Sequence, residues 1–253
     1  MADREPALVH FGRLPHHTSR ALVCVPQAGC GAAVFALWQR ALADTAAVWA
    51  VRLPGRETRL PEAAVTTMAQ MVDDVVPEIA ALEADDLVLF GHCSGALLAY
   101  EAAHALSSDS RRRRVRLIVS SQMAPGQAPP PSGRAISSLP MPELIRELRR
   151  IGGTADDILM SGDLMEAMAP MIRADFAAIE SYRDQPDREL LKIPIIAIGG
   201  KNDSIVSRLE LEHWARHTVG SFTLRLFDAD HFYLDKEQSA VLAFVRTLFD
   251  DKT

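Results

Sequence analysis

The fold is decided by residues 87–100, which read Leu87-Val-Leu-Phe-Gly-His-Cys-Ser-Gly-Ala-Leu-Leu-Ala-Tyr100. A short apolar run leads into a turn bounded by two glycines, and a helical pattern follows the turn directly. A strand, a tight turn and a helix in this order are typical of a nucleophile elbow, in which a sharp turn exposes one side chain. The residue at the centre of the turn is Cys93, whereas Ser94 lies one position too late.

Cys93 is therefore the candidate nucleophile. Its thiol would lie at the N-terminus of the following helix, whose positive end favours the thiolate. Gly91 and Gly95 leave room for a strained turn and for close packing of that helix. A small buried cysteine in a glycine turn is the alternative interpretation, but the complete strand-turn-helix context favours the nucleophile.

Strand-like and helix-like patterns alternate along the chain. Short apolar runs predict strands at Ala21–Val25, Val48–Leu53, Leu87–Phe90, Val115–Ser120, Ile193–Ile198 and Thr223–Phe227. Amphipathic runs predict helices at Val34–Leu42, Met68–Leu82, Ala96–Leu106, Leu209–His217 and Ser239–Phe249. This alternation predicts an α/β fold with a mostly parallel central sheet flanked by helices, and such sheets carry their active sites at the carboxyl ends of the strands.

Residues 124–185 interrupt the alternation, because they contain no convincing strand. A loop rich in Pro, Gly and Ser at 124–134 precedes a helical pattern over Pro140–Tyr182, which is broken at Ile151–Thr154. An all-helical insertion here predicts a lid over the active site, with Met side chains as an adaptable apolar wall. Ordinary packing helices are the alternative. We expect residues 1–253 to form a single domain.

The composition excludes several classes of partner. A formal net charge of -6 gives no broad basic field, so we expect no nucleic acid and no anionic membrane surface as the main partner. The one dense basic cluster, Arg111–Arg114 with Arg116, predicts either a solvated turn or a docking patch for an acidic partner. No apolar run approaches the length that a bilayer requires.

The cysteine count concerns the compartment. Three cysteines favour a reducing cytoplasm over a disulfide framework. Separately, we expect the protein to be a monomer.

His231 is the candidate general base. It follows the predicted strand that ends at Phe227 through a short Asp-Ala-Asp turn, so it lies at a strand's carboxyl end, facing the elbow. Other histidines occupy positions more typical of surface or packing residues: His10, His16, His17, His104, His213 and His217.

Asp203 is the candidate acid of the triad. In a fold with this kind of elbow, the chain order is nucleophile, acid, histidine, and Asp203 lies on a glycine-bearing loop after the predicted strand 193–198. Its role would be to hold the tautomer of the imidazole and to stabilise the imidazolium. Asp228 and Asp230 are rivals, but they lie too near His231 in the same turn to approach it from a separate loop.

An oxyanion intermediate requires backbone N–H donors that already point toward it. One donor should be the amide of Ser94, and we assign the second to Ala28 in the loop Val25–Gly31. A plain turn is the alternative for this loop.

Cys24 and Cys30 are predicted to be structural, although Cys30 could lie near the pocket. No metal cluster, dinucleotide fingerprint or phosphate-binding loop occurs, so we expect no metal and no cofactor bound to the chain itself.

These motifs belong to a pattern that covers nearly the whole chain: Pro26–Gly29, Leu53–Glu57, Gly91–Gly95, Glu147–Thr154, Arg173–Phe176, the Asp203 loop with Trp214, and Asp230–Phe232. The pattern resembles the stand-alone type II thioesterases of polyketide and nonribosomal peptide assembly lines. The resemblance implies an α/β-hydrolase fold with a helical lid. It also implies a substrate acyl group carried on the phosphopantetheine arm of an acyl or peptidyl carrier protein.

The chain departs from that family at three places. Gln27 replaces the usual His of the first loop, Cys30 replaces a usual second Gly, and the usual elbow Gly-His-Ser-Met-Gly is here Gly91-His-Cys-Ser-Gly95. A cysteine exchanges one thioester for another of similar energy, so the acyl group stays activated. Two reactions therefore stay open: hydrolysis of the acyl group, and its transfer to a thiol or an amine, which includes cyclisation. A noncatalytic carrier-binding scaffold and a lipase are weaker alternatives.

Overall fold

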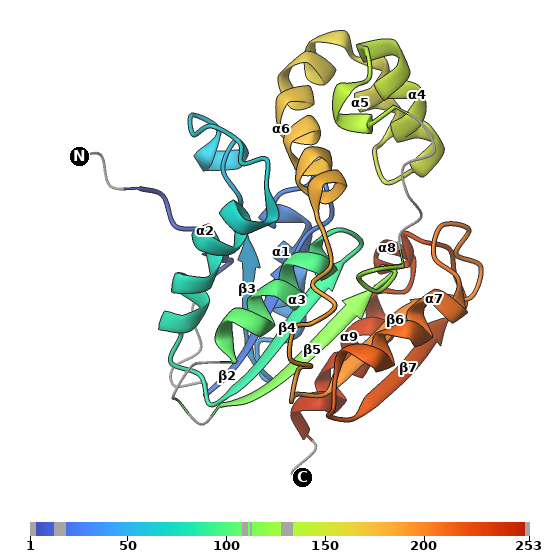
Figure 1. Cartoon of the computed structure of the whole chain (residues 1–253). Helices are drawn as coiled ribbons and strands as arrows, with labels where there is room; N and C mark the ends of the chain where they lie inside the picture. Colours follow the sequence, from blue (N-terminus) through green and yellow to red (C-terminus); the bar gives the residue numbers. More distant parts are fainter. Residues whose placement is uncertain (1–3, 13–18, 108–110, 112, 128–133, 251–253) are drawn as a thin grey trace.

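A computed structural model of the chain describes residues 4–12, 19–107, 111, 113–127 and 134–250. Within this part of the chain, a seven-stranded sheet lies at the centre, in the order β1-β3-β2-β4-β5-β6-β7 (Figure 1). The strands are β1 (Leu8–His10), β2 (Arg20–Val25), β3 (Ala47–Val51), β4 (Asp86–His92), β5 (Arg114–Ser120), β6 (Ile195–Gly200) and β7 (Phe222–Phe227). β1 pairs antiparallel with β3, and the other neighbours pair in parallel. The predicted α/β class with a mostly parallel sheet is confirmed.

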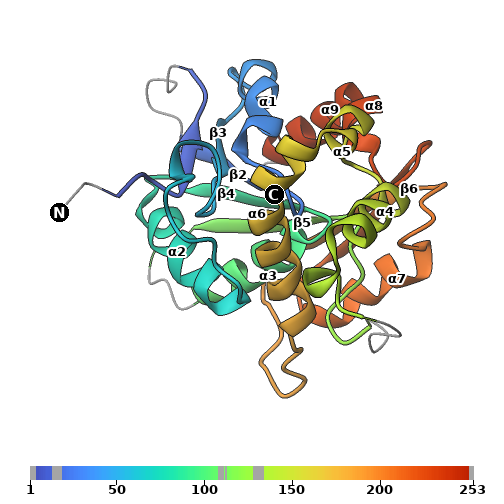
Figure 2. The same cartoon turned by 90° about the horizontal axis from the view of Figure 1, so that it is seen from above.

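Helices connect the strands and cover both faces of the sheet. They are η1 (Ala32–Phe35), α1 (Ala36–Ala41), η2 (Glu57–Arg59), α2 (Met68–Ala81), α3 (Gly95–Leu106), η3 (Ile136–Ser138), α4 (Met141–Ile151), α5 (Asp156–Met160), α6 (Gly162–Ser181), α7 (Arg208–Glu212), η4 (His213–His217), α8 (Tyr233–Lys236) and α9 (Gln238–Asp250). Seen from above, α1 and α9 lie on one side of the sheet, and α2 and α3 lie on the other (Figure 2). None of the described helices is long and apolar enough to cross a bilayer.

Strand β4 shows why the central strands are continuous apolar runs in the sequence. Leu87 and Leu89 pack into the core that includes α2 and α3. Val88 and Phe90 pack into a second core, which includes α1 and α9. Because helices cover both faces, the side chains on both faces must be apolar, and the alternation of polar and apolar residues disappears. The elbow therefore extends from a strand that is packed on both faces.

Helices α4, α5 and α6 lie above the carboxyl ends of the strands, in the segment where a lid is predicted (Figure 1). They pack through an apolar cluster of their own, which includes Leu144 and Met165. Helix α4 ends at Ile151 and is followed by Gly152 and Gly153, whose φ angles of 87° and 80° are readily adopted only by glycine. This explains the break that the sequence shows at Ile151–Thr154. Of the predicted loop 124–134, residues 128–133 lie outside the described part of the chain.

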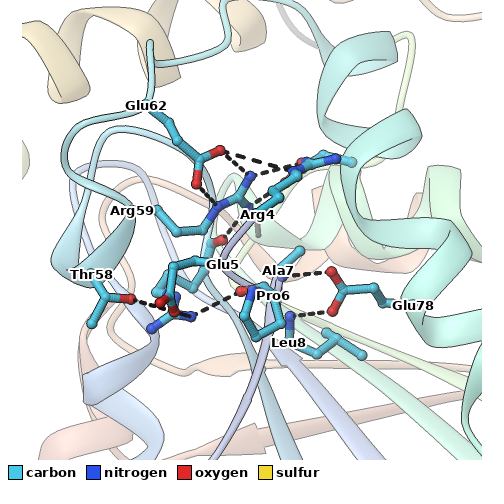
Figure 3. Close-up of polar contacts among 11 residues, drawn as sticks. Arg4, Glu5, Pro6, Ala7, Leu8, Thr58, Arg59, Glu62 and Glu78 are labelled. Carbon is cyan, nitrogen blue, oxygen red and sulfur yellow. Dashed lines mark hydrogen bonds and ion pairs between the residues drawn. The ribbon is translucent and has the colours of Figure 1, made fainter. Parts of the chain in front are cut away.

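Contacts from side chains distant in sequence fix the N-terminal segment and the edge strand β1 (Figure 3). The carboxylate of Glu78 in α2 accepts a hydrogen bond from the Ala7 N–H at 2.7 Å. Arg59, which is fully buried, donates to both carboxylate oxygens of Asp74 in α2, at 2.7 and 3.0 Å. Arg4 also pairs with Asp74. A three-residue strand held in this way leaves no periodic signal in the sequence, so β1 was not predicted.

The basic cluster before β5 is engaged within the fold. Arg113 donates to backbone carbonyls at the C-terminal end of α2, where a cation is favoured by the helix dipole. Arg114 and Arg116 both pair with Asp86 of β4. Arg112 and the two histidines at 16 and 17 lie outside the described residues. Arg113, Arg114 and Arg116 thus have partners within the fold, as expected for a structural role of these three side chains.

Candidate active site

Cys93 lies in the turn between β4 and α3, with a φ angle of +50° that side-chain-bearing residues rarely adopt. Its N–H donates to the carbonyl oxygen of Ser120 in β5 at 2.7 Å, and its own carbonyl oxygen accepts from the Ala96 N–H at 2.9 Å. The turn is thus attached to the neighbouring strand on one side and to the first turn of α3 on the other. The thiol is free and partly exposed. This is the strained, fixed geometry that an elbow requires.

Both glycines of the elbow are required by close backbone packing. A Cβ atom on Gly91 would lie 2.3 Å from the Gly95 carbonyl oxygen. A Cβ atom on Gly95 would lie 2.4 Å from the carbonyl oxygen of Val25, at the end of β2. These contacts bring the start of α3 against the loop that follows β2. Any side chain at either position would move the nucleophile away from that loop.

Asp203 and His231 come together from the loops after β6 and β7. The imidazole Nδ1 of His231 lies 2.8 Å from Asp203 Oδ2, and the two side chains are 4% and 0% exposed. Asp203 Oδ1 accepts hydrogen bonds from the backbone N–H groups of Ile205 and Val206, at 2.8 and 2.9 Å. The carboxylate is therefore fixed by its own loop and keeps one oxygen for the histidine. Asp230, a rival in the sequence, instead pairs with Lys236 at 2.5 Å.

The surroundings of this pair favour an ionised carboxylate beside a protonated imidazole. Burial disfavours the imidazolium of His231, but interactions with Asp203 and Cys93 outweigh it and raise the pKa of His231 to about 9. Burial likewise disfavours the carboxylate of Asp203, yet the hydrogen bonds that it accepts lower its pKa below the ordinary value. Among the described residues, His231 Nε2 is buried without a well-aligned hydrogen-bond partner. Since Nδ1 is bound to Asp203 and the interactions of His231 include a hydrogen bond with Cys93, Nε2 is the nitrogen that is available to the Cys93 side chain.

A second buried histidine, His92, lies directly behind the nucleophile. Its Nδ1 is 2.8 Å from Ser120 Oγ, which is 2.5 Å from the Tyr233 hydroxyl. Burial and the nearby charge of His231 lower the pKa of His92 to about 3. It is therefore neutral near pH 7, and its contact with Ser120 ties the elbow to β5.

The two predicted oxyanion donors also lie together. The backbone N–H of Ala28 points to the elbow and donates to the Ser94 hydroxyl at 2.8 Å. Gln27 and Cys30 close the turn that carries Ala28, since the Cys30 N–H donates to the Gln27 carbonyl at 3.1 Å. In the free protein, the Ser94 hydroxyl thus accepts the hydrogen bond of the Ala28 N–H, the group that we assign to the oxyanion. The spacing of residues in the sequence gives no sign of this contact.

Two features of the site were missed at the sequence level. Asp175 of α6 forms a buried ion pair with Arg56 and accepts a hydrogen bond from the Gly29 N–H, so helix α6 contacts the loop after β2. The ring of Phe232, next to His231, packs against Gly153, where a Cβ atom would lie 2.3 Å from the ring. Both members of the ion pair lie in segments of the family-like pattern, Leu53–Glu57 and Arg173–Phe176, and this is the sign that the sequence offers for them.

A cavity of about 130 Å³ opens beside the elbow. Gln27, Cys30 and His92 line one part of it, and Gly153, after α4, and Phe232, next to His231, line another. Cys30 therefore faces the site, whereas Cys24 is buried in the core, and burial raises the pKa of the Cys24 thiol. A thiol with a raised pKa inside the core is inert.

Another cavity, of about 370 Å³, lies at the amino ends of the strands, beside Leu87, Val115 and Ile193. Of the cations along its wall, Arg188 is paired with Glu101, and the Lys192 ammonium is paired within its own turn. Since α/β sheets bind substrates at the carboxyl ends of their strands, the smaller cavity at the elbow is the better candidate site. Nowhere in the described ranges do three or more His, Cys, Asp or Glu side chains converge as metal ligands would.

Comparison with known proteins identifies the family. Residues 20–249 match the thioesterase domain family. Over 224 residues, the chain is 34% identical to the gramicidin S biosynthesis protein GrsT of Aneurinibacillus migulanus, a match that covers 88% of this chain and 86% of that protein. Over 220 residues, it is 33% identical to the thioesterase PikA5 of Streptomyces venezuelae, with coverage of 85% and 76%.

A solved structure shows the same architecture. The type II thioesterase BorB from the borrelidin biosynthetic cluster aligns with a TM-score of 0.86 and 32% identity, over 98% of this chain and 100% of that one. The α/β-hydrolase fold that the resemblance implies is therefore confirmed. Over residues 20–249, the chain belongs to the thioesterase domain family.

Proposed function

We propose that this thioesterase removes acyl groups from the phosphopantetheine arm of an acyl or peptidyl carrier protein in a polyketide or nonribosomal peptide pathway. The observation that carries the proposal is the convergence of Cys93, His231 and Asp203 at the carboxyl ends of β4, β7 and β6. Family membership supports thioester chemistry, and relatives named for gramicidin S and borrelidin biosynthesis support the pathway class. We propose that the protein acts as a cytoplasmic monomer, with helices α4–α6 as its lid and with no bound cofactor.

Acylation starts from the Cys93 thiolate beside the His231 imidazolium. The sulfur attacks the thioester carbonyl, and the oxyanion that forms is stabilised by the backbone N–H groups of Ala28 and Ser94. The carbon-sulfur bond to the carrier then breaks, and the leaving phosphopantetheine thiolate takes the proton of His231. The products are a free carrier thiol and an acyl group on Cys93, with a neutral His231.

Deacylation repeats these steps with water. Neutral His231 removes a proton from water as the oxygen attacks the acyl carbon, and the bond to Cys93 then breaks with the sulfur leaving as the thiolate. Asp203 holds the imidazole in position in both halves of the reaction. The final state is a carboxylic acid and the original ion pair, so no further reactant is required.

The cysteine favours a second candidate function, which is transfer of the acyl group to another carrier thiol or to an amine. An acyl group on sulfur keeps the energy of the thioester, whereas an acyl group on serine would lose part of it. The same site could therefore release the acyl group to water or pass it to a second acceptor. Hydrolysis is the first proposal, because it is the activity that names the family.

One assay separates these functions. The protein is incubated with an acyl-loaded carrier, with and without an empty acceptor carrier bearing a free phosphopantetheine thiol. Hydrolysis predicts free acid at the same rate in both mixtures. Acyl groups that appear on the acceptor carrier, at the expense of free acid, would show transfer instead. If neither product forms and the mass of the protein does not change, the chain is a noncatalytic scaffold.

Removal of the Ser94 hydroxyl is expected to increase the rate of acylation. Ser94→Ala frees the Ala28 N–H, which donates to that hydroxyl in the free protein. Because one hydrogen bond has a net value of about 0.5–1.5 kcal/mol, kcat/KM for an acyl carrier should rise about 2- to 10-fold. Steady-state kinetics of free-acid release provides the measurement. A 10-fold loss in Ser94→Ala would show that the hydroxyl donates to the oxyanion and does not compete with it.

A further inference from the structure

A buried ion pair joins the lid segment to the loop that carries an oxyanion donor. Asp175 lies on α6, and Arg56 lies in the segment that follows β3. Arg56 Nη2 is 2.7 Å from Asp175 Oδ1, and Arg56 Nη1 is 3.0 Å from Asp175 Oδ2. Each side chain is 4% exposed. The geometry is bidentate, which fixes the orientation of the two groups as well as their distance.

The same two side chains hold the backbone of the turn Gln27–Cys30. Asp175 Oδ2 accepts a hydrogen bond from the Gly29 N–H at 2.8 Å, and Arg56 Nη1 donates to the Cys30 carbonyl at 2.8 Å. Gly29 has a φ angle of +76°, as at the third position of a type II turn. The hydrogen bond to Asp175 anchors the Gly29 N–H, and so it holds the backbone that directly follows Ala28. The ion pair therefore fixes the turn that presents the Ala28 N–H.

Two further contacts support this turn. Ile172, one helical turn before Asp175 on α6, packs on Gly29, where a Cβ atom would lie 3.2 Å from Ile172 Cγ1. On the far side of the loop, the Glu57 carboxylate accepts from the Ala33 N–H at 2.9 Å. The turn is thus held between the lid helix and the segment that carries Arg56 and Glu57.

We infer that Asp175 and Arg56 are positioning residues for catalysis: their ion pair couples the seating of lid helix α6 to the orientation of the oxyanion turn 27–30. This inference rests on the proposed thioesterase function. When α6 is seated, the Gly29 N–H is bound and the Ala28 N–H faces the elbow. When α6 leaves, the turn loses the acceptor that anchors its Gly29 N–H. A lid that closes over substrate would then complete the oxyanion site in the same step.

The chain contains a matched control for loss of a buried ion pair. Arg59 and Asp74 form a bidentate pair of comparable burial, with side chains 0% and 4% exposed. Asp74 lies on α2 and pairs with Arg59 and with Arg4 of the N-terminal segment. Arg59 follows Arg56 in the same short segment, but its bonds to Glu62 and to the Arg52 carbonyl do not involve Asp74 and are kept in Asp74→Asn (Figure 3). Asp175→Asn and Asp74→Asn remove the same charge from similar surroundings. Only the first should change the oxyanion site.

The experiment compares two reactions of Cys93 in the full chain and in the two variants. Acylation by a p-nitrophenyl ester and by an acyl carrier passes through an oxyanion, whereas alkylation by iodoacetamide does not. Asp175→Asn is expected to slow acylation about 10-fold or more with both acyl donors, since a misplaced donor stabilises the oxyanion poorly. Its alkylation rate, measured on folded protein, should stay within about twofold of the wild-type rate. Asp74→Asn should retain both rates.

The possible failures are distinguishable. Equal acylation rates in Asp175→Asn and Asp74→Asn would overturn the coupling and leave the proposed function intact. A parallel loss of alkylation and acylation in Asp175→Asn would also overturn it, because the defect would then concern the thiol itself. Wild-type protein that reacts with the p-nitrophenyl ester but with no acyl carrier would overturn the proposed substrate class alone. If Asp175→Asn unfolds, Arg56→Lys, which keeps the charge and loses the bidentate geometry, is expected to show the same selective loss.

Discussion

Replacement of Cys93 by alanine is expected to abolish the covalent acyl intermediate and to lower the rate of thioester cleavage by about 10⁴-fold or more, as loss of the nucleophile does in triad enzymes. The reason is chemical, because alanine has no atom that can accept the acyl group. The elbow itself should survive, since its hydrogen bonds to Ser120 and Ala96 are made by the backbone of residue 93. Single-turnover kinetics with an acyl-loaded carrier measures the loss.

Cys30→Ala is the matched control, because Cys30 is also a partly exposed cysteine and lines the cavity beside the elbow. That variant should still form the acyl intermediate. An adduct of full yield in Cys93→Ala would contradict the assignment and would direct attention to the neighbouring Ser94.

Asp203→Asn is expected to reduce kcat/KM by about 10²- to 10⁴-fold and to change its pH dependence. In the wild-type protein, interactions with Asp203 and Cys93 outweigh burial and raise the pKa of His231 to about 9, so the imidazolium is present below that pH. As the pH rises through about 9, His231 loses the proton that the leaving thiolate needs, and kcat/KM should fall. Without the Asp203 carboxylate the pKa of His231 decreases, so this alkaline limb should move to lower pH.

The pH profile of kcat/KM in both proteins provides the measurement. Asp230→Asn is the control, because Asp230 precedes His231 directly but pairs with Lys236. Its alkaline limb should match that of the wild-type protein. An alkaline limb that stays in place in Asp203→Asn would show that another group controls the protonation of His231.

Most of the architecture was predictable, because buried parallel strands are short, continuous apolar runs that can be recognised from neighbouring residues alone. The strand β4 is apolar on both faces, and the amphipathic patterns beside it have the period of helices. Cys93, Asp203 and His231 could be placed together for a related reason. Each follows a strand of one parallel sheet, and the carboxyl ends of such strands share an edge.

The remaining contacts depend on packing across long stretches of chain. Arg56 and Asp175 are 119 residues apart, and no spacing rule indicates which buried aspartate faces which arginine. The hydrogen bond between Ala28 and the Ser94 hydroxyl depends on a single side-chain rotation. The edge strand β1 is held by hydrogen bonds from the Ala7 and Leu8 N–H groups to the carboxylate of Glu78, and its three residues are too few to show an alternating pattern.

The most direct test of the central claim is to locate the acyl group on the protein. Wild-type protein is mixed with an acyl-loaded carrier, quenched in acid within the first turnover, digested and analysed by mass spectrometry. We predict the acyl mass on the peptide that contains Cys93, and we predict that neutral hydroxylamine removes it rapidly, as expected of a thioester. An acyl group on Ser94 that resists this treatment, or a peptide that stays unmodified while free acid accumulates, would contradict the account.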